Sequence, residues 1–246
     1  MDSSPSIMFY DIASGPPVTC FAPNPWKARY ALNFKGASYQ TKWVELPEVT
    51  STRKALGVPP CRTFSDGSPF YTLPVIEDLS TGEKVGDSFD IAVYLDKKYP
   101  DAPRLLPSSS IGLHASFNAH VDALFTRYVI LCFHGMPFNP KTAELSKKTF
   151  AARAGAKSWD ELAIKGEARK ITLEGFKAEL AELAKTYSYT EGPFLEGNTV
   201  SYADFIVGAW LQFAKASLPE WDDLQRWHEC RWGRLHLALE KYANIT

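Results

Sequence analysis

The sequence predicts two successive structural units, an α/β half followed by an all-α half. The first hundred residues alternate between short apolar segments rich in strand formers and longer segments with helical spacing. Tyr99–Ser110, YPDAPRLLPSSS, holds three prolines and three serines, which is typical of a linker. Beyond it the pattern is helical, with no convincing strand. We therefore expect domains at 1–100 and 111–246, joined by a linker at 101–110.

The elements of the first half follow in a simple order. Strands are expected at Ile7–Ile12, Ala37–Leu46 and Phe70–Asp78, with a short fourth strand after the turn TGEKV. Helices are expected at Trp26–Phe34, ended by Gly36, and at Ser88–Tyr99, stopped by Pro100. The proline-containing segment from Lys42 to Phe70 is expected to be mostly loop. A parallel strand pair followed by a hairpin, with helices on the sheet, is the thioredoxin-like plan, although the pattern alone does not exclude other small α/β folds.

The second half is predicted from helical periodicity. The strongest candidates for helices are Ile111–Cys132, Glu161–Tyr187, Ser201–Ala216 and Leu224–Tyr242. Ser201 and Asp204 form an S-x-x-D capping box before an apolar run, which indicates a helix start and a role in folding.

Composition excludes several classes of function. The chain has 246 residues, 45% of them apolar, and 27 Lys and Arg against 28 Asp and Glu, so no global charge favours nucleic acid or an anionic membrane as a partner. No apolar run approaches the roughly 20 residues that span a bilayer, and MDSSPSIMFYDIAS does not resemble a signal peptide, so we expect a cytoplasmic protein. The four cysteines show no zinc spacing, and no metal is expected.

Two dipeptides in the first half could bind a ligand. Pro74 interrupts an otherwise central strand, so Leu73-Pro74 marks an edge, a bulge or a cis bond; a cis bond would leave the backbone of Leu73 free to pair with an extended peptide. Asp87-Ser88 precedes a helix, where capping explains both residues. The same pair could instead hold a carboxylate through Ser88 and an ammonium through Asp87, which together describe an amino-acid head group.

The three motifs in this order resemble those of a cytosolic glutathione transferase, and the helix NPWKARYALNFKG with the proline-rich loop is most similar to the fungal FuA, etherase-related group. The resemblance implies a glutathione transferase fold, glutathione as co-substrate, and a homodimer. It implies that Leu73 pairs with the cysteinyl unit, that Pro74 is cis, that Thr72 borders this site, and that Asp87 and Ser88 hold the γ-glutamyl end. The glycyl carboxylate has four candidate partners, with none distinguished: Lys42, Arg53, Lys54 and Arg62.

The turn before the first helix departs from the family pattern. Related transferases often have Ser-Pro-Asn there, and the serine hydroxyl donates to the glutathione sulfur; this chain has Ala22-Pro23-Asn24. The remaining donors are the helix amino terminus and the amide of Asn24, which we expect to be the catalytic residue, with Ala22 and Trp26 also at the glutathione site. Asn24 could equally be only the helix cap, with Pro25 at the first position. Cys20 could instead form a mixed disulfide with glutathione, but its offset of two residues from the matching position favours a buried structural thiol. Tyr10 is a weaker candidate, because aromatic residues near the end of a strand usually belong to the core.

The second substrate is expected between the domains, against aromatic residues. Phe21, Phe125 and Tyr128 are the candidates for lining this site, although most aromatic residues of Phe117–Phe138 should belong to the core. The leading hypothesis is a transferase that conjugates glutathione to hydrophobic aromatic electrophiles. The alternative is a ligandin that carries aromatic or polyphenolic compounds with little catalysis, for which Ala22 is the main argument. A fold relative without glutathione chemistry is disfavoured by the two dipeptides.

Overall fold

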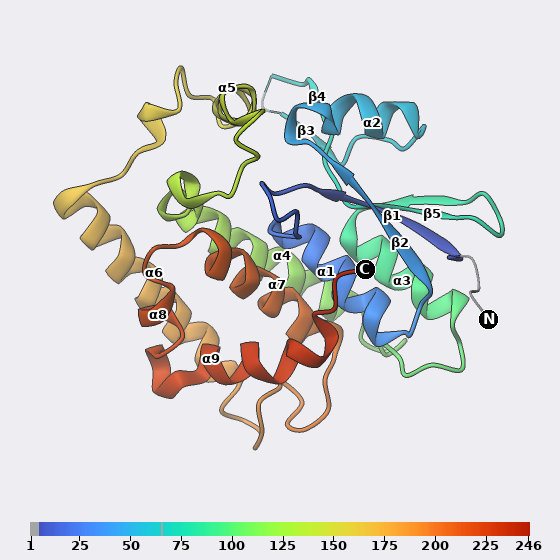
Figure 1. Cartoon of the computed structure of the whole chain (residues 1–246). Coiled ribbons are helices and arrows are strands. Elements are labelled where there is room, and N and C mark those ends of the chain that lie inside the picture. Colours follow the sequence, from blue (N-terminus) through green and yellow to red (C-terminus); the bar gives the residue numbers. More distant parts are fainter. Residues whose placement is uncertain (1–4, 65) are drawn as a thin grey trace.

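The computed structural model describes residues 5–64 and 66–246. Residues 1–4 and Ser65 belong to the predicted first domain and lie outside the described residues. Figure 1 shows the α/β unit packed beside the helical unit, with the long helix α7 (Tyr202–Ser217) lying against α1 (Pro23–Phe34). The predicted fold, a thioredoxin-like domain followed by a helical domain, is confirmed.

The sheet of the first domain has four strands in the order β2-β1-β5-β6. These are β1 (Ile7–Ile12), β2 (Tyr39–Val44), β5 (Val75–Asp78) and β6 (Lys84–Gly86). β1 pairs in parallel with β2 and antiparallel with β5, which pairs antiparallel with β6. The predicted parallel pair followed by a hairpin is therefore confirmed. The predicted strand Phe70–Asp78 is shorter than expected, because its backbone leaves the ladder before Val75.

Two helices pack on this sheet. α1 begins at Pro23, and α3 (Ser88–Lys98) begins directly after the sheet's last strand. Their apolar positions form one core with β1, whose Ile7 and Phe9 are fully buried. Because both helices start at the same end of the sheet, their amino termini are brought close to the β5 residues that begin the hairpin.

The prediction of loop from Lys42 to Phe70 is wrong in part. The segment contains a 3-10 turn (Leu46–Glu48), the helix α2 (Val49–Ala55), and the short pair β3 (Arg62–Thr63) and β4 (Pro69–Phe70). A helix of 7 residues completes barely two turns, which is too short for a clear periodic pattern. Its stability comes from Val49 and Arg53, both buried against the rest of the domain.

The helical domain contains α4 (Ile111–Tyr128), α5 (Ala143–Arg153), α6 (Gly166–Thr186), α7, α8 (Trp221–Leu224) and α9 (Trp227–Leu239). α5 was not predicted, because its residues are mixed in polarity around the whole helix. The predicted helix Leu224–Tyr242 is divided: His228, Glu229 and Cys230 have positive φ values between 51° and 59°, so the chain kinks there. No helix among residues 5–64 and 66–246 is both long and apolar enough to span a membrane.

α7 is the central helix of this domain. Its residues from Tyr202 to Ala214 are buried on all sides, as expected for a helix inside a core. The predicted capping box is confirmed: the Ser201 side chain accepts from the Asp204 amide, and an Asp204 carboxylate oxygen accepts from the Ser201 amide at 2.9 Å.

Buried polar contacts fix the two domains to each other. The Lys27 ammonium, fully buried on α1, donates to a carboxylate oxygen of Asp122 on α4 at 2.5 Å, and the Trp210 indole N–H donates to the same oxygen at 2.7 Å. At the amino-terminal end of α7, the Tyr202 hydroxyl donates to the carbonyl of Ser88 at 2.8 Å. The first turns of α1 and α3 are therefore held by the helical domain.

Candidate active site

The first turn of α1 offers a restricted set of hydrogen-bond donors. Ala22 is the N-cap and has no side-chain oxygen to satisfy the turn. Pro23 and Pro25 have no amide hydrogen, and the amide of Trp26 already donates to the carbonyl of Ala22 at 3.2 Å. Among the residues of this first turn, Asn24 therefore has the backbone N–H that makes no hydrogen bond within the described residues.

Asn24 is the second residue of α1, so the interpretation of its side chain as the helix cap is wrong. The side chain is partly exposed and makes no hydrogen bond within the described part of the chain. Its amide group is available to a ligand above the first turn. Asn24 thus presents a backbone donor and a side-chain donor at the same helix end.

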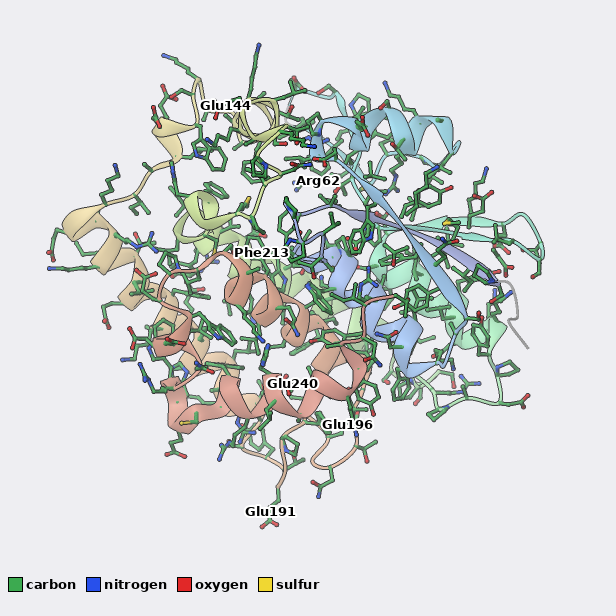
Figure 2. All side chains as sticks on the ribbon, viewed as in Figure 1. Arg62, Glu144, Glu191, Glu196, Phe213 and Glu240 are labelled. Atoms are coloured by element: carbon green, nitrogen blue, oxygen red, sulfur yellow. The ribbon has the colours of Figure 1, made fainter. Side chains whose placement is uncertain are left out.

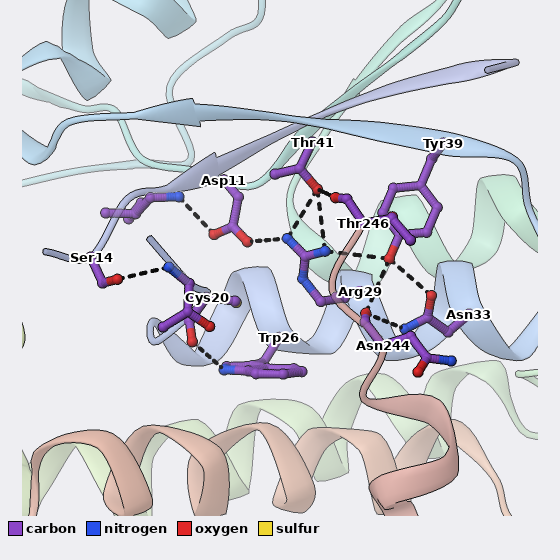
Figure 3. A network of polar contacts seen from close by, with 12 residues as sticks. Asp11, Ser14, Cys20, Trp26, Arg29, Asn33, Tyr39, Thr41, Asn244 and Thr246 are labelled. Atoms are coloured by element: carbon purple, nitrogen blue, oxygen red, sulfur yellow. Dashed lines mark hydrogen bonds and ion pairs between the residues drawn. The ribbon is translucent and has the colours of Figure 1, made fainter. Parts of the chain in front are cut away.

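Cys20 and Trp26 lie at the back of this turn (Figure 3). The Cys20 side chain is buried beside Asp11, and burial raises the pKa of its thiol well above the ordinary value. The indole N–H of Trp26 donates to the Cys20 carbonyl at 3.1 Å. Cys20 is therefore a protonated structural thiol, and both N–H groups of Trp26 are used within the protein.

Figure 3 also shows why the α1 opening is rigid. The guanidinium of Arg29, fully buried, donates to a carboxylate oxygen of Asp11 at 2.7 Å and to the Thr41 hydroxyl at 3.2 Å. Asn33, one turn further along α1, donates to the carbonyl of Asn244 at 2.9 Å. These contacts join α1 to β1, β2 and the C-terminal segment, so the first turn cannot rotate independently of the sheet.

Tyr10 does not face the α1 opening as a donor. Its hydroxyl donates to a carboxylate oxygen of Glu77 on the neighbouring strand at 3.0 Å. Burial and this contact raise the pKa of Tyr10 to about 12. A phenol held in this way is a poor proton source for a thiolate.

Leu73 and Pro74 occupy the break before β5. The Leu73-Pro74 peptide bond is cis, one of the three geometries expected from the sequence. Leu73 is 1% exposed, and its amide makes no backbone hydrogen bond within the described residues. The Thr72 hydroxyl donates to the Leu73 carbonyl at 3.3 Å. The Leu73 amide therefore has no backbone partner at this break in the strand within the described residues.

Asp87 and Ser88 form the start of α3. Asp87, not Ser88, is the N-cap, and its backbone has φ 68°, which is rare for a residue with a side chain. Its amide donates to the Pro74 carbonyl at 3.3 Å, so the α3 start is tied to the Leu73-Pro74 turn. The Asp87 side chain is 43% exposed, whereas Ser88 is buried. The two predicted ligand-binding dipeptides are thus brought together.

The four basic candidates for the glycyl carboxylate have different environments. Arg53 is buried and donates to the carbonyl of Thr72 at 2.8 Å and to the Asp87 carboxylate at 3.3 Å, so it faces the protein. Lys42, Lys54 and Arg62 are exposed and lie over the rings of Tyr10, Tyr71 and Phe70 respectively. The three exposed cations remain candidates, and one of them, Arg62, which is labelled in Figure 2, is the first residue of β3.

An apolar cavity of about 150 Å³ adjoins the α1 opening. Both domains contribute to it, and every lining side chain is apolar: Ile12, Phe21, Ala22, Pro23 and Leu46 from the first domain, and Val129, Met136, Phe138, Phe150, Trp210 and Phe213 from the second. Phe213 of α7, which is labelled in Figure 2, is one of the side chains that line this cavity. The N-cap of α1 is therefore part of the cavity wall.

Two of the three aromatic residues expected at this cavity lie elsewhere. Phe21 lines it, but Phe125 is 4% exposed and stacks on the Trp210 indole with ring centres 5.2 Å apart. The Tyr128 hydroxyl donates to Glu179 on α6 at 2.8 Å. Phe138 and Phe150 line the cavity instead, because the segment after α4 folds back over the first domain. The Asn139 side chain fixes that fold by donating to Glu45 at 2.7 Å.

The described residues contain no group of three or more His, Cys, Asp or Glu side chains placed to hold a metal ion. The donors at the starts of α1 and α3 and the apolar cavity beside Ala22 lie at the end of the sheet where β5 begins.

Comparisons with known proteins agree with this arrangement. Residues 21–98 match the family model of the glutathione S-transferase N-terminal domain, and residues 112–242 match that of the C-terminal domain. A glutathione S-transferase of Ceriporiopsis subvermispora, crystallised in complex with glutathione, is 36% identical with a TM-score of 0.89, covering 98% of this chain and 99% of that one. The transferase GSTFuA2 of Phanerochaete chrysosporium is 30% identical with a TM-score of 0.83, covering 99% and 100%.

A curated relative extends the comparison. A glutathione S-transferase-like protein of Aspergillus flavus is 29% identical over 238 residues, covering 90% of this chain and 83% of its own length. Both domain models match in the expected order, and together they span most of the sequence. The chain belongs to the glutathione S-transferase family and is of the fungal FuA type.

Proposed function

We propose that the protein binds glutathione at the end of the sheet where β5, α1 and α3 begin. Leu73 pairs its backbone with the cysteinyl unit, beside Thr72 and Pro74. Asp87 meets the γ-glutamyl ammonium, and Ser88 with the α3 amino terminus meets the γ-glutamyl carboxylate. Two observations support this proposal. The hydrogen bond from the Asp87 amide to the Pro74 carbonyl brings the two dipeptides together, and a relative was crystallised with glutathione.

The reaction is conjugation of the glutathione sulfur to a hydrophobic electrophile. The thiol loses its proton to solvent, the thiolate forms a bond to the electrophilic carbon, and the leaving group departs with its electron pair. The observation that carries the proposal is that Ala22 and Pro23, at the α1 opening, also line the apolar cavity. A sulfur above that opening would face an electrophile in the cavity directly, which supplies proximity.

Asn24 provides the thiolate stabilisation in place of a serine hydroxyl. A helix amino terminus contributes about 0.3–1 kcal/mol, and up to about 2 kcal/mol in partly buried geometry. A hydrogen bond to a charged group adds about 1.5–3 kcal/mol. Since about 1.36 kcal/mol corresponds to one pKa unit, these donors together lower the thiol pKa by about one to three units from its free value near 8.5.

The cavity restricts the electrophile. Its volume of about 150 Å³ is similar to that of an apolar protein cavity that admits benzene, so the space between the two domains accommodates one aromatic ring. A hydroxyl group placed among its apolar side chains would lose its hydrogen bonds, at a cost of about 1–3 kcal/mol. We therefore propose single-ring aromatic electrophiles without free hydroxyl groups on the inserted part.

Titration of the bound thiol tests the thiolate assignment. The ultraviolet absorbance of the thiolate, followed against pH at saturating glutathione, gives its pKa in the parent and in two variants. Asn24→Ala removes the side-chain donor and should raise the pKa part of the way to the free value. Asn24→Pro also removes the backbone donor, at a helix position where proline is tolerated, and should raise it fully. An unshifted pKa in the parent contradicts the mechanism.

Substrate size tests the cavity assignment. We expect kcat/KM to be at least about fivefold higher for a halogenated single-ring electrophile than for its fused two-ring counterpart of equal intrinsic reactivity, because displacement of a packed wall costs about 1–3 kcal/mol. Phe213→Ala should reduce this preference by enlarging the cavity. Equal kcat/KM values for the two compounds in the parent would contradict the proposal that the cavity selects single-ring electrophiles.

A ligandin is the second candidate function, and Ala22 is the observation that favours it. An aromatic or polyphenolic carrier needs the cavity but no activated thiol. Calorimetry of aromatic ligands, with and without glutathione, distinguishes the two functions when combined with the thiol titration. Tight ligand binding together with an unshifted thiol pKa would favour the ligandin.

The proposal includes a cytoplasmic homodimer, which the family resemblance supports. Light scattering of the purified protein during size-exclusion chromatography measures the mass of the assembly against the 27.5 kDa of one chain. A single-chain mass at micromolar concentration would contradict the dimer.

A further inference from the structure

The guanidinium of Arg53 connects the three segments that surround the proposed γ-glutamyl site. Its side chain is only 2% exposed. Nε donates to the Pro59 carbonyl at 2.8 Å, and one terminal nitrogen donates to the Thr72 carbonyl at 2.8 Å. The two terminal nitrogens reach the two Asp87 carboxylate oxygens at 3.3 and 3.5 Å. One side chain therefore joins the loop after α2, the residue before Leu73 and the start of α3.

Asp87 needs this support. Its positive φ places it in a backbone region that costs about 1–3 kcal/mol for a residue with a side chain, and such geometry persists only where the surroundings impose it. The Arg53 fork contacts the inner edge of the carboxylate, and the Cys61 thiol lies beside the same group. The carboxylate remains 43% exposed, so an outer edge is left for a ligand.

We propose that Arg53 is a positioning residue for glutathione: it fixes the Asp87 carboxylate in the orientation that receives the γ-glutamyl ammonium. The inference rests on the proposed function. In this proposal Arg53 does not bind the glycyl carboxylate. Its side chain is only 2% exposed and its donors are directed at protein oxygens, so it does not reach solvent.

The site is shaped for a guanidinium. A planar fork can donate to two carbonyls and both carboxylate oxygens at once, whereas the three N–H donors of a lysine ammonium all leave one nitrogen and cannot reach acceptors spaced in this way. The neighbouring Gly86 completes the fit: a Cβ there would lie 2.5 Å from a terminal nitrogen of Arg53 and 2.7 Å from Val58. The absence of a side chain at position 86 is therefore required for the guanidinium to lie beside Asp87.

Arg53→Lys tests the inference, with Arg104→Lys as the matched control. Arg104 is exposed and carries the same chemical change without these contacts. Calorimetry is carried out with glutathione and with glutaryl-Cys-Gly, which lacks only the α-amino group of the γ-glutamyl unit. We expect Arg53→Lys to weaken glutathione binding about tenfold more than it weakens binding of the analogue. Arg104→Lys should change neither.

Steady-state kinetics provides a second measurement. In Arg53→Lys the KM for glutathione should rise while kcat and the pKa of the bound thiol stay at parental values, because the α1 donors are untouched. Gly86→Ala, which retains the charge and displaces the guanidinium, should give the same selective loss if Arg53→Lys fails to fold.

The outcomes separate the two proposals. No binding of glutathione by the parent would overturn the proposed function and this inference with it. Binding by the parent, with an equal loss for glutathione and glutaryl-Cys-Gly in the variants, would overturn the inference alone. A selective loss for glutathione supports it.

Discussion

Restoring a hydroxyl at position 22 is the sharpest test of how this protein activates a thiol. Ala22 is the N-cap of α1, with an extended backbone at φ −71° and ψ 141°, which is the conformation that a serine cap adopts. Ala22 also lines the apolar cavity and is 8% exposed, so a hydroxyl there would be largely shielded from water. The Ala22→Ser variant therefore adds one donor without a change in backbone.

The magnitude follows from the donors already present. A hydroxyl that donates to a thiolate contributes about 1.5–3 kcal/mol, which corresponds to a fall of about one to two pKa units. The serine oxygen would also accept the Asn24 amide, since Pro25 has no N–H to offer. Withdrawal of that donor from the sulfur costs about 0.3–1 kcal/mol. The net expectation is a thiol pKa about one unit below that of the parent.

The assay is the ultraviolet titration of bound glutathione, supported by the pH dependence of kcat/KM. Ala22→Gly is the control, because glycine is also accepted at an N-cap and brings no hydroxyl. Its thiol pKa should equal that of the parent. If Ala22→Ser and Ala22→Gly give the same thiol pKa while both bind glutathione, the position of the sulfur above the α1 opening is wrong.

Three further predictions concern stability and the thiols. Asp11→Ala leaves the fully buried Arg29 without its carboxylate, so the free energy of unfolding measured with urea should fall by about 3–5 kcal/mol; a loss below about 1 kcal/mol would contradict a buried ion pair. Burial raises the pKa of Asp204 from 3.8 to about 6, so its contribution to stability is present below about pH 4 and is lost as the pH rises through about 6. The stability of the parent relative to Asp204→Asn should fall by up to about 3 kcal/mol between pH 4 and 7, and a constant difference would refute this. Cys20→Ala should retain the thiol titration, and peptide mass spectrometry after treatment with oxidised glutathione should find modification at the exposed Cys230, whereas a mixed disulfide at Cys20 would overturn its structural role.

Local chemistry in the sequence was sufficient for the order of the elements and for several helix ends. Ser201 and Asp204 predict a capping box because both hydrogen bonds lie within one turn, and the structure confirms it. The Leu73-Pro74 and Asp87-Ser88 dipeptides stand out because a proline that interrupts a strand and an acid-serine pair before a helix, although each has a local explanation, also resemble a family motif when they occur in this order. Their contact through the Asp87 amide and the Pro74 carbonyl follows once the hairpin is recognised.

Contacts between distant segments were not accessible in the same way. Arg53 is one of four basic residues near the second strand, and nothing local distinguishes it from Lys54, its exposed neighbour. Its burial depends on a short helix that packs only in the folded domain. The lining of the cavity is a similar case. Phe138 and Phe150 line it, in place of the expected Phe125 and Tyr128, because the chain turns back after α4.

The sequence by itself determined the two-domain plan, the family and the absence of a hydroxyl at the α1 opening, since periodicity, caps and residue identity are local properties. Only the tertiary structure decided which donor remains at that opening, which cation supports Asp87 and which rings enclose the cavity. Each of these depends on burial and on hydrogen bonds between residues far apart in the chain, and a hydrogen bond that is already made inside the protein is no longer available to a ligand.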